Sequence, residues 1–398
     1  MRKTSLWIGI FGLAAAAGLG LSFSRGPAGS AGRSIVLVGG TLIDGNGRPP
    51  LTDMDIVVRD NRIAAVGPRG TISIPDGAMV LNFQGRTILP GFMNVHAHYT
   101  HIASNLLSWG REGVTTIRNL VCSWDEYISC KTYIRQQNDP RIPRVLFTGP
   151  CLDVPGGRAY PYRTNGIWLT SVEDARLQTN FLLDQGVDLI KVYLEDGSYW
   201  GESFAVMPPE MLRAIVETAH ARRARVTAHV QMLWILEMAL DCGVDDIAHS
   251  ILDQEIPDAV IARMVQSDTY LVPTLEIYGP GSARAMGQAN LKRLVDGGVH
   301  VALGTDFETG LQTGMPSFEM QFMQDAGITP MQIIVAATKH AAHVCGLGSE
   351  LGTIEPGKVA DIVVVDGDPL ANLNILKYNR ILVIHNGRIA FSRLTSNF

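Results

Sequence analysis

The 398-residue sequence lacks a marked excess of charge, closely spaced cysteine pairs and internal repeats. Its net charge of -5 contains no run of one sign, so nothing indicates nucleic acid as a partner. None of its five cysteines forms a C-x-x-C pair, which argues against zinc binding by thiolates. Hydrophobic residues make up 46% and charged residues 18%, a composition that excludes disorder and predicts a well-buried globular protein.

The first 31 residues differ from the rest of the chain. A short basic start precedes an almost continuously apolar stretch at 6–21 and a small, loop-like stretch at 22–31. This layout predicts a secretory signal peptide over residues 1–31. The apolar stretch is shorter than the ~20 residues of a spanning helix, and no clean Ala-x-Ala site is present, so an uncleaved membrane anchor is the alternative.

Either alternative predicts an exported protein, periplasmic or secreted, that contacts the membrane only if the segment stays uncleaved. In such a compartment Cys122 could pair with Cys130, or either of them with Cys151. Isolated buried thiols are the other interpretation of these cysteines.

The two ends of the remaining chain resemble each other in pattern. Residues 32–89 and 357–398 contain short β-like runs broken by turns, such as the Asn386-Gly387 turn. We expect these ends to pair into one small β-sandwich domain.

Residues 90–356 alternate between strand-like and helix-like segments. Amphipathic helical stretches include 209–222 and 331–344. The strand candidates are 92–98, 114–120, 144–150, 187–193, 225–231, 245–251, 270–276 and 300–306. Eight strands separated by helices predict an α/β fold of the (β/α)8 TIM-like barrel type, in which catalytic residues lie at the carboxyl ends of the strands.

The pair His96 and His98 carries the clearest chemical signal. Alternate residues of a strand point to the same face, so both imidazoles project together and form a clamp for zinc or a similar divalent ion. A strand cannot complete the coordination sphere alone, so further ligands are expected elsewhere in the chain.

Other predicted strand ends supply them. His229 and His249 end two successive strands, and Asp306 closes the last one. Lys191 stands in an otherwise apolar strand, where an unpaired ammonium would be costly. The sequence therefore predicts a metal centre at the barrel mouth.

These motifs resemble those of the amidohydrolase superfamily, in particular the branch of imidazolonepropionases and Xaa-Pro dipeptidases. The resemblance is carried by residues 90–98, by the strand-end His229 and His249, by Gly304-Thr305-Asp306 and by residues 351–364. It implies a metal-dependent hydrolase of carbon–nitrogen bonds.

Relatives with a lysine on the fourth strand imply the details of the centre. Lys191 would be N-carboxylated and would bridge two divalent ions, expected to be zinc. One ion would be bound by His96, His98 and Asp306, and the other by His229 and His249. Asp306 would also be the catalytic residue that moves the proton to the leaving amine. An ordinary paired Lys191 would instead indicate a single-metal enzyme.

Substrate contacts are expected from His101, Arg158, Tyr193 and Gln231. An arginine can pair with a substrate carboxylate, yet relatives often have a histidine at the position of Arg158 and an aromatic residue at that of Gln231. His300 starts the last strand about 20 Å before Asp306 and cannot share its metal. The remaining histidines, His220, His340, His343 and His385, are expected to be structural.

Three functions fit these residues. The first is hydrolysis of amide bonds in dipeptides or N-acyl amino acids. The second is hydrolysis of lactones, cyclic amides or esters at the same centre, and the third is metal binding without catalysis. The complete ligand set with Asp306 argues against the third. The expected partner is a small molecule, and the oligomeric state is left open, a homo-oligomer included.

Overall fold

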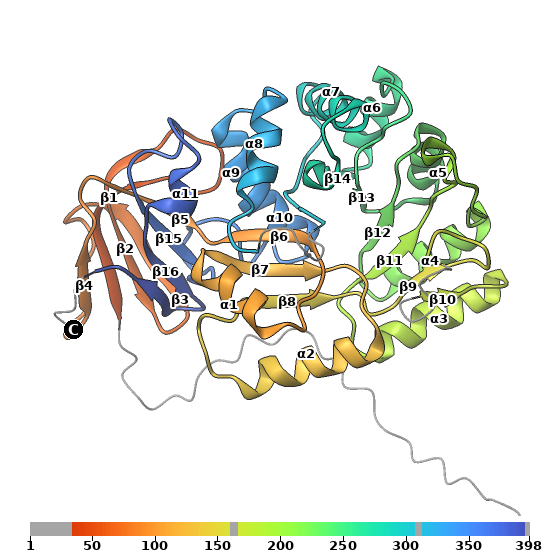
Figure 1. Cartoon of the computed structure of the whole chain (residues 1–398). Helices are drawn as coiled ribbons and strands as arrows, with labels where there is room; N and C mark the ends of the chain where they lie inside the picture. Colours follow the sequence, from red (N-terminus) through yellow and green to blue (C-terminus); the bar gives the residue numbers. More distant parts are fainter. Residues whose placement is uncertain (1–33, 160–165, 307–312, 395–398) are drawn as a thin grey trace, which may run out of the picture. The chain divides into compact units, whose positions relative to one another are not determined.

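The computed structural model describes residues 34–159, 166–306 and 313–394 (Figure 1). The signal peptide or anchor predicted over residues 1–31 lies outside the described residues. None of the helices in the described ranges is long and apolar enough to cross a membrane.

Both ends of the chain contribute to one eight-stranded sheet, drawn in red-orange and dark blue in Figure 1. Its order is β17-β16-β15-β5-β1-β2-β3, and β4 pairs with β1. The two ends meet where β15 runs antiparallel to β5, with Val364 opposite Ile88. The strands are β1 (Ile35–Leu42), β2 (Leu51–Arg59), β3 (Arg62–Pro68), β4 (Met79–Asn82), β5 (Arg86–Pro90), β15 (Ile362–Asp366), β16 (Arg380–His385) and β17 (Arg388–Ser392). The domain limits at residues 89/90 and 356/357 stay predictions.

Alternation along β15 explains how this sheet joins the rest of the molecule. Ile362 and Val364 face a core shared with the other end strands, whereas Val363 and Val365 belong to the main core. Because successive side chains of a strand point to opposite faces, one apolar strand can be part of two cores.

The middle of the chain alternates parallel strands with helices, so the predicted α/β class is confirmed. The strands pair in two sheets, β6-β7-β8 and β10-β9-β11-β12-β13-β14. They are β6 (Phe92–Ala97), β7 (Val114–Asn119), β8 (Arg144–Phe147), β9 (Cys151–Asp153), β10 (Gly166–Trp168), β11 (Ile190–Tyr193), β12 (Val226–His229), β13 (Asp246–Ala248) and β14 (Tyr270–Val272). Seven of the eight expected strands are present, each shorter than predicted.

The eighth expected strand, 300–306, is present only as a bridge between Val301 and Leu271. Backbone hydrogen bonds nevertheless connect it to both neighbours, from Leu271 N to His300 O at 3.0 Å and from Val95 N to Leu303 O at 3.0 Å. Within the described strands the pairing does not close into a continuous barrel.

Helices cover the parallel strands and pack their apolar faces into the main core. They are α1 (Ala103–Arg111), α2 (Trp124–Gln136), α3 (Val172–Asp184), α4 (Pro209–Ala221), α5 (Leu233–Cys242), α6 (Asp258–Gln266), α7 (Ser282–Asp296), α8 (Ser317–Asp325), α9 (Pro330–Val335), α10 (Ala341–Val344) and α11 (Ile375–Tyr378). The remaining short elements are the 3-10 turns η2 (Ser198–Trp200) and η3 (Leu275–Ile277) and the π-helical stretch η4 (Ala336–His340). The expected helix at 209–222 is α4, and the one at 331–344 is the continuous run of α9, η4 and α10.

The five cysteines are free thiols. Cys122, Cys130 and Cys151 are buried, and burial raises the pKa of the Cys130 thiol to about 11. The disulfide interpretation is therefore wrong for this structure, and the alternative of isolated buried thiols is confirmed.

Candidate metal centre

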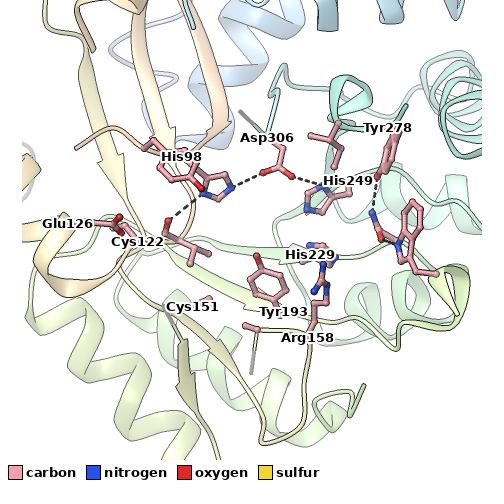
Figure 2. Close-up of a pocket in the computed structure, with 16 residues that line it drawn as sticks. His98, Cys122, Glu126, Cys151, Arg158, Tyr193, His229, His249, Tyr278 and Asp306 are labelled. Atoms are coloured by element: carbon pink, nitrogen blue, oxygen red, sulfur yellow. Dashed lines mark hydrogen bonds and ion pairs between the residues drawn. The ribbon is translucent and has the colours of Figure 1, made fainter. Parts of the chain in front are cut away.

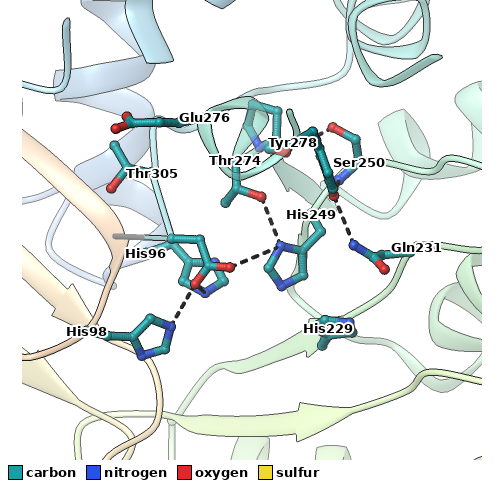
Figure 3. A network of polar contacts seen from close by, with 12 residues as sticks. His96, His98, His229, Gln231, His249, Ser250, Thr274, Glu276, Tyr278 and Thr305 are labelled. Carbon is teal, nitrogen blue, oxygen red and sulfur yellow. Dashed lines mark hydrogen bonds and ion pairs between the residues drawn. The ribbon is translucent and has the colours of Figure 1, made fainter. Parts of the chain in front are cut away.

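The side chains expected to bind metal come together at the carboxyl ends of the parallel strands (Figures 2 and 3). His96 lies near the end of β6 and His229 is the last residue of β12, while His249 directly follows β13. The rings of His96 and His249 have centroids 4.9 Å apart, and those of His229 and His249 are 4.2 Å apart. β12 and β13 are adjacent in one parallel sheet and so end at the same edge, and β6 is joined to that edge through the segment 300–306, whose Asp306 N donates to His96 O at 2.8 Å.

Asp306 is the point on which the histidines converge. Its Oδ1 lies 3.0 Å from His96 Nε2 and 2.7 Å from His98 Nε2, and its Oδ2 lies 3.8 Å from His249 Nδ1. One ligand atom from each of His96, His249 and Asp306 falls within 4.8 Å of the others. This arrangement is a candidate site for a divalent metal ion.

The hydrogen bonding of His98 indicates that a cation fits there. Its Nδ1 lies 3.4 Å from the carbonyl oxygen of Val121, and its Nε2 lies 2.7 Å from Asp306 Oδ1. A neutral imidazole carries one N–H and can donate to only one of these acceptors. A metal ion bound to both Nε2 and Asp306 would leave the ring proton on Nδ1, which could then donate to Val121 O.

Buried nitrogens without a partner point to the same conclusion. Among the described residues, His96 Nδ1, His229 Nδ1 and Lys191 Nζ are buried and have no hydrogen-bond partner. Lys191 is only 1% exposed, and burial lowers its pKa to about 8, with Asp306 and Asp246 opposing that shift. Buried polar groups normally have partners, so His229 Nδ1 and Lys191 Nζ suit a ligand or a modification that supplies one, whereas His96 already directs its other nitrogen, Nε2, at Asp306.

The electrostatics keep the donors in forms that bind metal. Burial lowers the pKa of His96 to about 3 and that of His249 well below its usual value. Burial alone would raise the pKa of Asp306, but His96 and His98 hold it well below the usual range. The group therefore consists of neutral imidazoles and an anionic carboxylate, the donor set that zinc and similar ions prefer.

The backbone at this edge is strained at several of the same residues. His249 has φ 82° and Asp306 has φ 54°, both in the left-handed region that non-glycine residues rarely adopt. Thr274, which contacts His249, has φ 47°. Such strain often accompanies functional sites, where the surrounding structure maintains it.

Two partners of the histidines were not singled out in the sequence. Glu195 Oε2 lies 3.3 Å from His229 Nε2, and Thr274 Oγ1 lies 2.9 Å from His249 Nδ1. Glu195 follows Lys191 and Tyr193 at the same alternate spacing, a signal that could have identified it. Thr274 has no comparable signal.

A pocket of about 430 Å³ opens beside the candidate metal centre (Figure 2). Arg158, Tyr193 and Gln231 line it as expected, and Tyr193 stacks on His229 with ring centroids 4.8 Å apart. His101 Nδ1 lies 3.4 Å from Glu126 Oε1, and it is Glu126 that lines the pocket.

Gln231 is held in the pocket wall by two aromatic residues. Trp200 Nε1 donates to Gln231 Oε1 at 2.8 Å, and Gln231 Nε2 donates to the Tyr278 hydroxyl at 3.1 Å. This pairing uses both ends of the amide. Gln231 therefore helps to fix the shape of the pocket wall as well as lining it.

A second histidine cluster lies where β14 and the segment 300–306 begin. His300 Nδ1 and His343 Nε2 lie 3.1 Å and 3.5 Å from the two carboxylate oxygens of Asp268. His340 Nδ1 contacts the carbonyl oxygen of Val301 at 3.0 Å. All three rings lie against Tyr270, the first residue of β14.

Comparisons with protein families, with known sequences and with solved structures agree with one another. Residues 111–390 match the family described as the amidohydrolase family. Ochratoxinase from Aspergillus niger is 24% identical over 404 residues, covering 86% of this chain and 83% of the relative. Imidazolonepropionase from Symbiobacterium thermophilum is 23% identical over 363 residues, covering 78% and 83%. The crystal structure of a putative prolidase from Bifidobacterium longum superposes with a TM-score of 0.79 at 27% identity, covering 93% of this chain and 97% of that one.

Proposed function

The chain belongs to the amidohydrolase family, and we propose that it is a metal-dependent hydrolase of amide bonds in dipeptides or N-acyl amino acids. Family membership confirms the resemblance drawn from the motifs, and it makes the protein an enzyme of a hydrolase family acting on carbon–nitrogen bonds. The substrate class is our proposal. The observation that carries the proposed metal-dependent hydrolysis is the convergence of His96, His98 and His249 on Asp306 beside a pocket.

Two zinc ions are proposed for the centre. His96, His98 and Asp306 would hold one ion, and His229 and His249 the other. Ions held there would supply an acidified water and a polarised substrate carbonyl. The unpartnered Nζ of Lys191 supports N-carboxylation: the neutral amine would add to carbon dioxide and lose a proton, and the resulting anionic carbamate would offer oxygen ligands to the ions.

Asp306 is proposed to move the proton. An anionic carboxylate oxygen takes the proton of the attacking water and later returns it to the leaving amine nitrogen. Its lowered pKa keeps the carboxylate ionised at neutral pH, so that it can accept a proton, but it also makes the group a weaker base. The reaction needs both steps, since an amide nitrogen leaves readily only when protonated.

The pocket supports a substrate that carries a carboxylate. Arg158 provides a guanidinium that can bind a carboxylate through two hydrogen bonds. The aromatic side chains of Tyr193, Trp200 and Tyr278 provide apolar surface beside it. We propose that Arg158 binds the free carboxylate of a dipeptide or N-acyl amino acid, with Tyr193 against the remainder and His101 acting through Glu126.

Two further proposals concern the whole chain. The segment 300–306 would complete a (β/α)8 barrel, a view supported by its hydrogen bonds to both neighbouring strands. The protein would be exported, or anchored through residues 1–31. Sequencing the amino terminus of mature protein from the native host separates cleavage from anchoring.

Metal analysis tests the proposed centre. Protein produced with zinc and bicarbonate should contain two ions per chain, and Lys191→Ala should lose at least one ion and most of its activity. Lys339→Ala, which changes an exposed lysine, is the matched control and should retain both. One ion per chain, with activity surviving Lys191→Ala, would contradict the bridged pair.

A substrate screen tests the reaction. Dipeptides and N-acyl amino acids should be cleaved faster than their methyl esters, which lack the free carboxylate. Faster cleavage of lactones, cyclic amides or esters would favour the second function instead.

A further inference from the structure

We propose that Glu195 and Thr274 are positioning residues that select which ring nitrogen of His229 and of His249 faces the metal. The inference rests on the proposed function, because it concerns the two histidines assigned to one ion. It assigns opposite nitrogens to the two rings: Nδ1 of His229 and Nε2 of His249. Each follows from the hydrogen bond made by the other nitrogen.

Glu195 determines the tautomer of His229. A carboxylate can only accept hydrogen bonds, so the 3.3 Å contact between its Oε2 and His229 Nε2 requires a proton on Nε2. A neutral ring then has its lone pair on Nδ1. That atom is buried and has no partner among the described residues, as expected for a nitrogen reserved for a metal.

The position of Glu195 is itself fixed. The residue is 2% exposed, and its Oε1 accepts a hydrogen bond from Gly197 N at 2.8 Å. Gly197 has φ 78°, and a Cβ there would lie 2.8 Å from the Phe204 ring and 2.9 Å from backbone of Glu202. Only glycine fits this turn, so the backbone donor to Oε1 is built into the fold.

Thr274 determines the tautomer of His249 through its hydroxyl, which contacts a ring nitrogen of His249 (Figure 3). The Tyr278 hydroxyl accepts from Gln231 Nε2 at 3.1 Å and from Ser250 N at 3.3 Å. These two bonds use both lone pairs of that hydroxyl oxygen and leave its proton to be donated, and Thr274 is a neighbour that can accept it. The second lone pair of Thr274 Oγ1 accepts from His249 Nδ1 at 2.9 Å and leaves Nε2 for the metal.

The loop that carries Thr274 is held by a buried carboxylate. Glu319 of α8 accepts from Leu275 N at 3.0 Å and from Glu276 N at 2.7 Å. These bonds fix the turn directly after Thr274 and help to maintain its left-handed backbone. Glu195 and Thr274 are thus both held in place by hydrogen bonds that do not require a bound ion.

The decisive experiment compares Glu195→Gln with Glu195→Ala. The Gly197 N–H draws the amide oxygen of glutamine to itself and turns the NH2 group toward His229 Nε2. That nitrogen must then accept, so the ring proton moves to Nδ1 and blocks the metal. Alanine leaves the ring free to adopt either tautomer.

We therefore expect the isosteric glutamine to be the more harmful change. Zinc affinity, measured against a competing chelator, should fall about 10- to 100-fold in Glu195→Gln and less in Glu195→Ala. Long-range ¹H–¹⁵N spectra of the metal-free protein should show His229 protonated on Nε2 in the wild type and on Nδ1 in Glu195→Gln. Thr274→Val should weaken zinc binding, and Thr274→Ser, which keeps the hydroxyl, should restore it.

Glu202→Gln, an exposed change in the same loop, is the control and should bind zinc like the wild type. Equal affinity in Glu195→Gln and the wild type, or a larger loss in Glu195→Ala than in Glu195→Gln, would overturn the inference. A wild-type protein that binds no zinc would instead refute the proposed function. The tautomer spectra would still decide the role of Glu195 in that case.

Discussion

Two histidine clusters lie at opposite ends of the segment 300–306, and each surrounds one aspartate. At its carboxyl end, His96 and His98 contact Asp306, and at its amino end His300 and His343 contact Asp268. Both aspartates even have left-handed backbones, with φ 54° and 51°. Residue type, pairing and backbone strain therefore do not distinguish the clusters.

Solvent exposure does distinguish them. The side chains of His96 and Asp306 are 2% and 11% exposed, whereas those of His300 and Asp268 are 49% and 55% exposed. Water can hydrate the exposed cluster around Asp268, called the outer cluster below, so its ion pairs need no other partner. In the buried cluster around Asp306, called the inner cluster below, buried nitrogens lack hydrogen-bond partners. A metal ion would supply a partner there.

The largest expected effect is at the inner aspartate. Asp306→Asn removes both the anionic donor and the proposed proton acceptor, so kcat should fall about 10³-fold. Steady-state kinetics with the best substrate from the screen, together with metal analysis, provides the measurement. Full activity in this variant would eliminate the proton transfer assigned to Asp306.

A smaller effect is expected from pH at the outer cluster. Burial lowers the pKa of His340 to about 4 from 6.5. Below pH 6.5 the unfolded chain takes up the proton before the folded protein does, so stability is lost as pH falls from 6.5 toward 4. Relative to His340→Gln, the wild type should lose about 1.4 kcal/mol per pH unit in this window.

Urea unfolding at pH 7, 6.5 and 5.5, at constant zinc, measures that difference. The comparison between wild type and variant cancels the contribution of the inner histidines. Parallel stability profiles for the two proteins would show that His340 is not the group that titrates.

The smallest effect is expected at the outer ion pairs. His300→Ala and His343→Ala should leave zinc content unchanged and kcat/KM within about twofold, because they alter solvated pairs worth about 0–1 kcal/mol. Metal analysis and kinetics on the two variants check this. A loss of one ion per chain would make the outer cluster a metal site and remove the contrast drawn above.

The sequence carried enough information to place the inner cluster. His229 and Asp306 could be assigned to strand ends because apolar runs stop at them, and the structure brings them to one edge of the sheets. The eighth strand was less predictable. His96 O accepts from both Thr305 N and Asp306 N, so the backbone there departs from regular pairing.

The contacts that tune the histidines required three-dimensional information. Gln231 pairs with Trp200 and Tyr278, which are 31 and 47 positions away in the chain. Thr274 contacts His249 from a left-handed backbone conformation, and no local sequence pattern predicts that conformation. Sequence patterns determine which side of a strand a residue faces, but not which residues of other loops meet it.

The pairing of β5 with β15 has a consequence for synthesis. Arg86 and Asp366 are partners in this ladder. The edge of β5 that pairs with β15 therefore stays unpaired until most of the chain has left the ribosome. During that interval an open strand edge with Ile88 and Leu89 is available for wrong pairings. We expect nascent chains that stop before Ile362 to aggregate or be degraded, even though every metal-binding side chain proposed above has already been made.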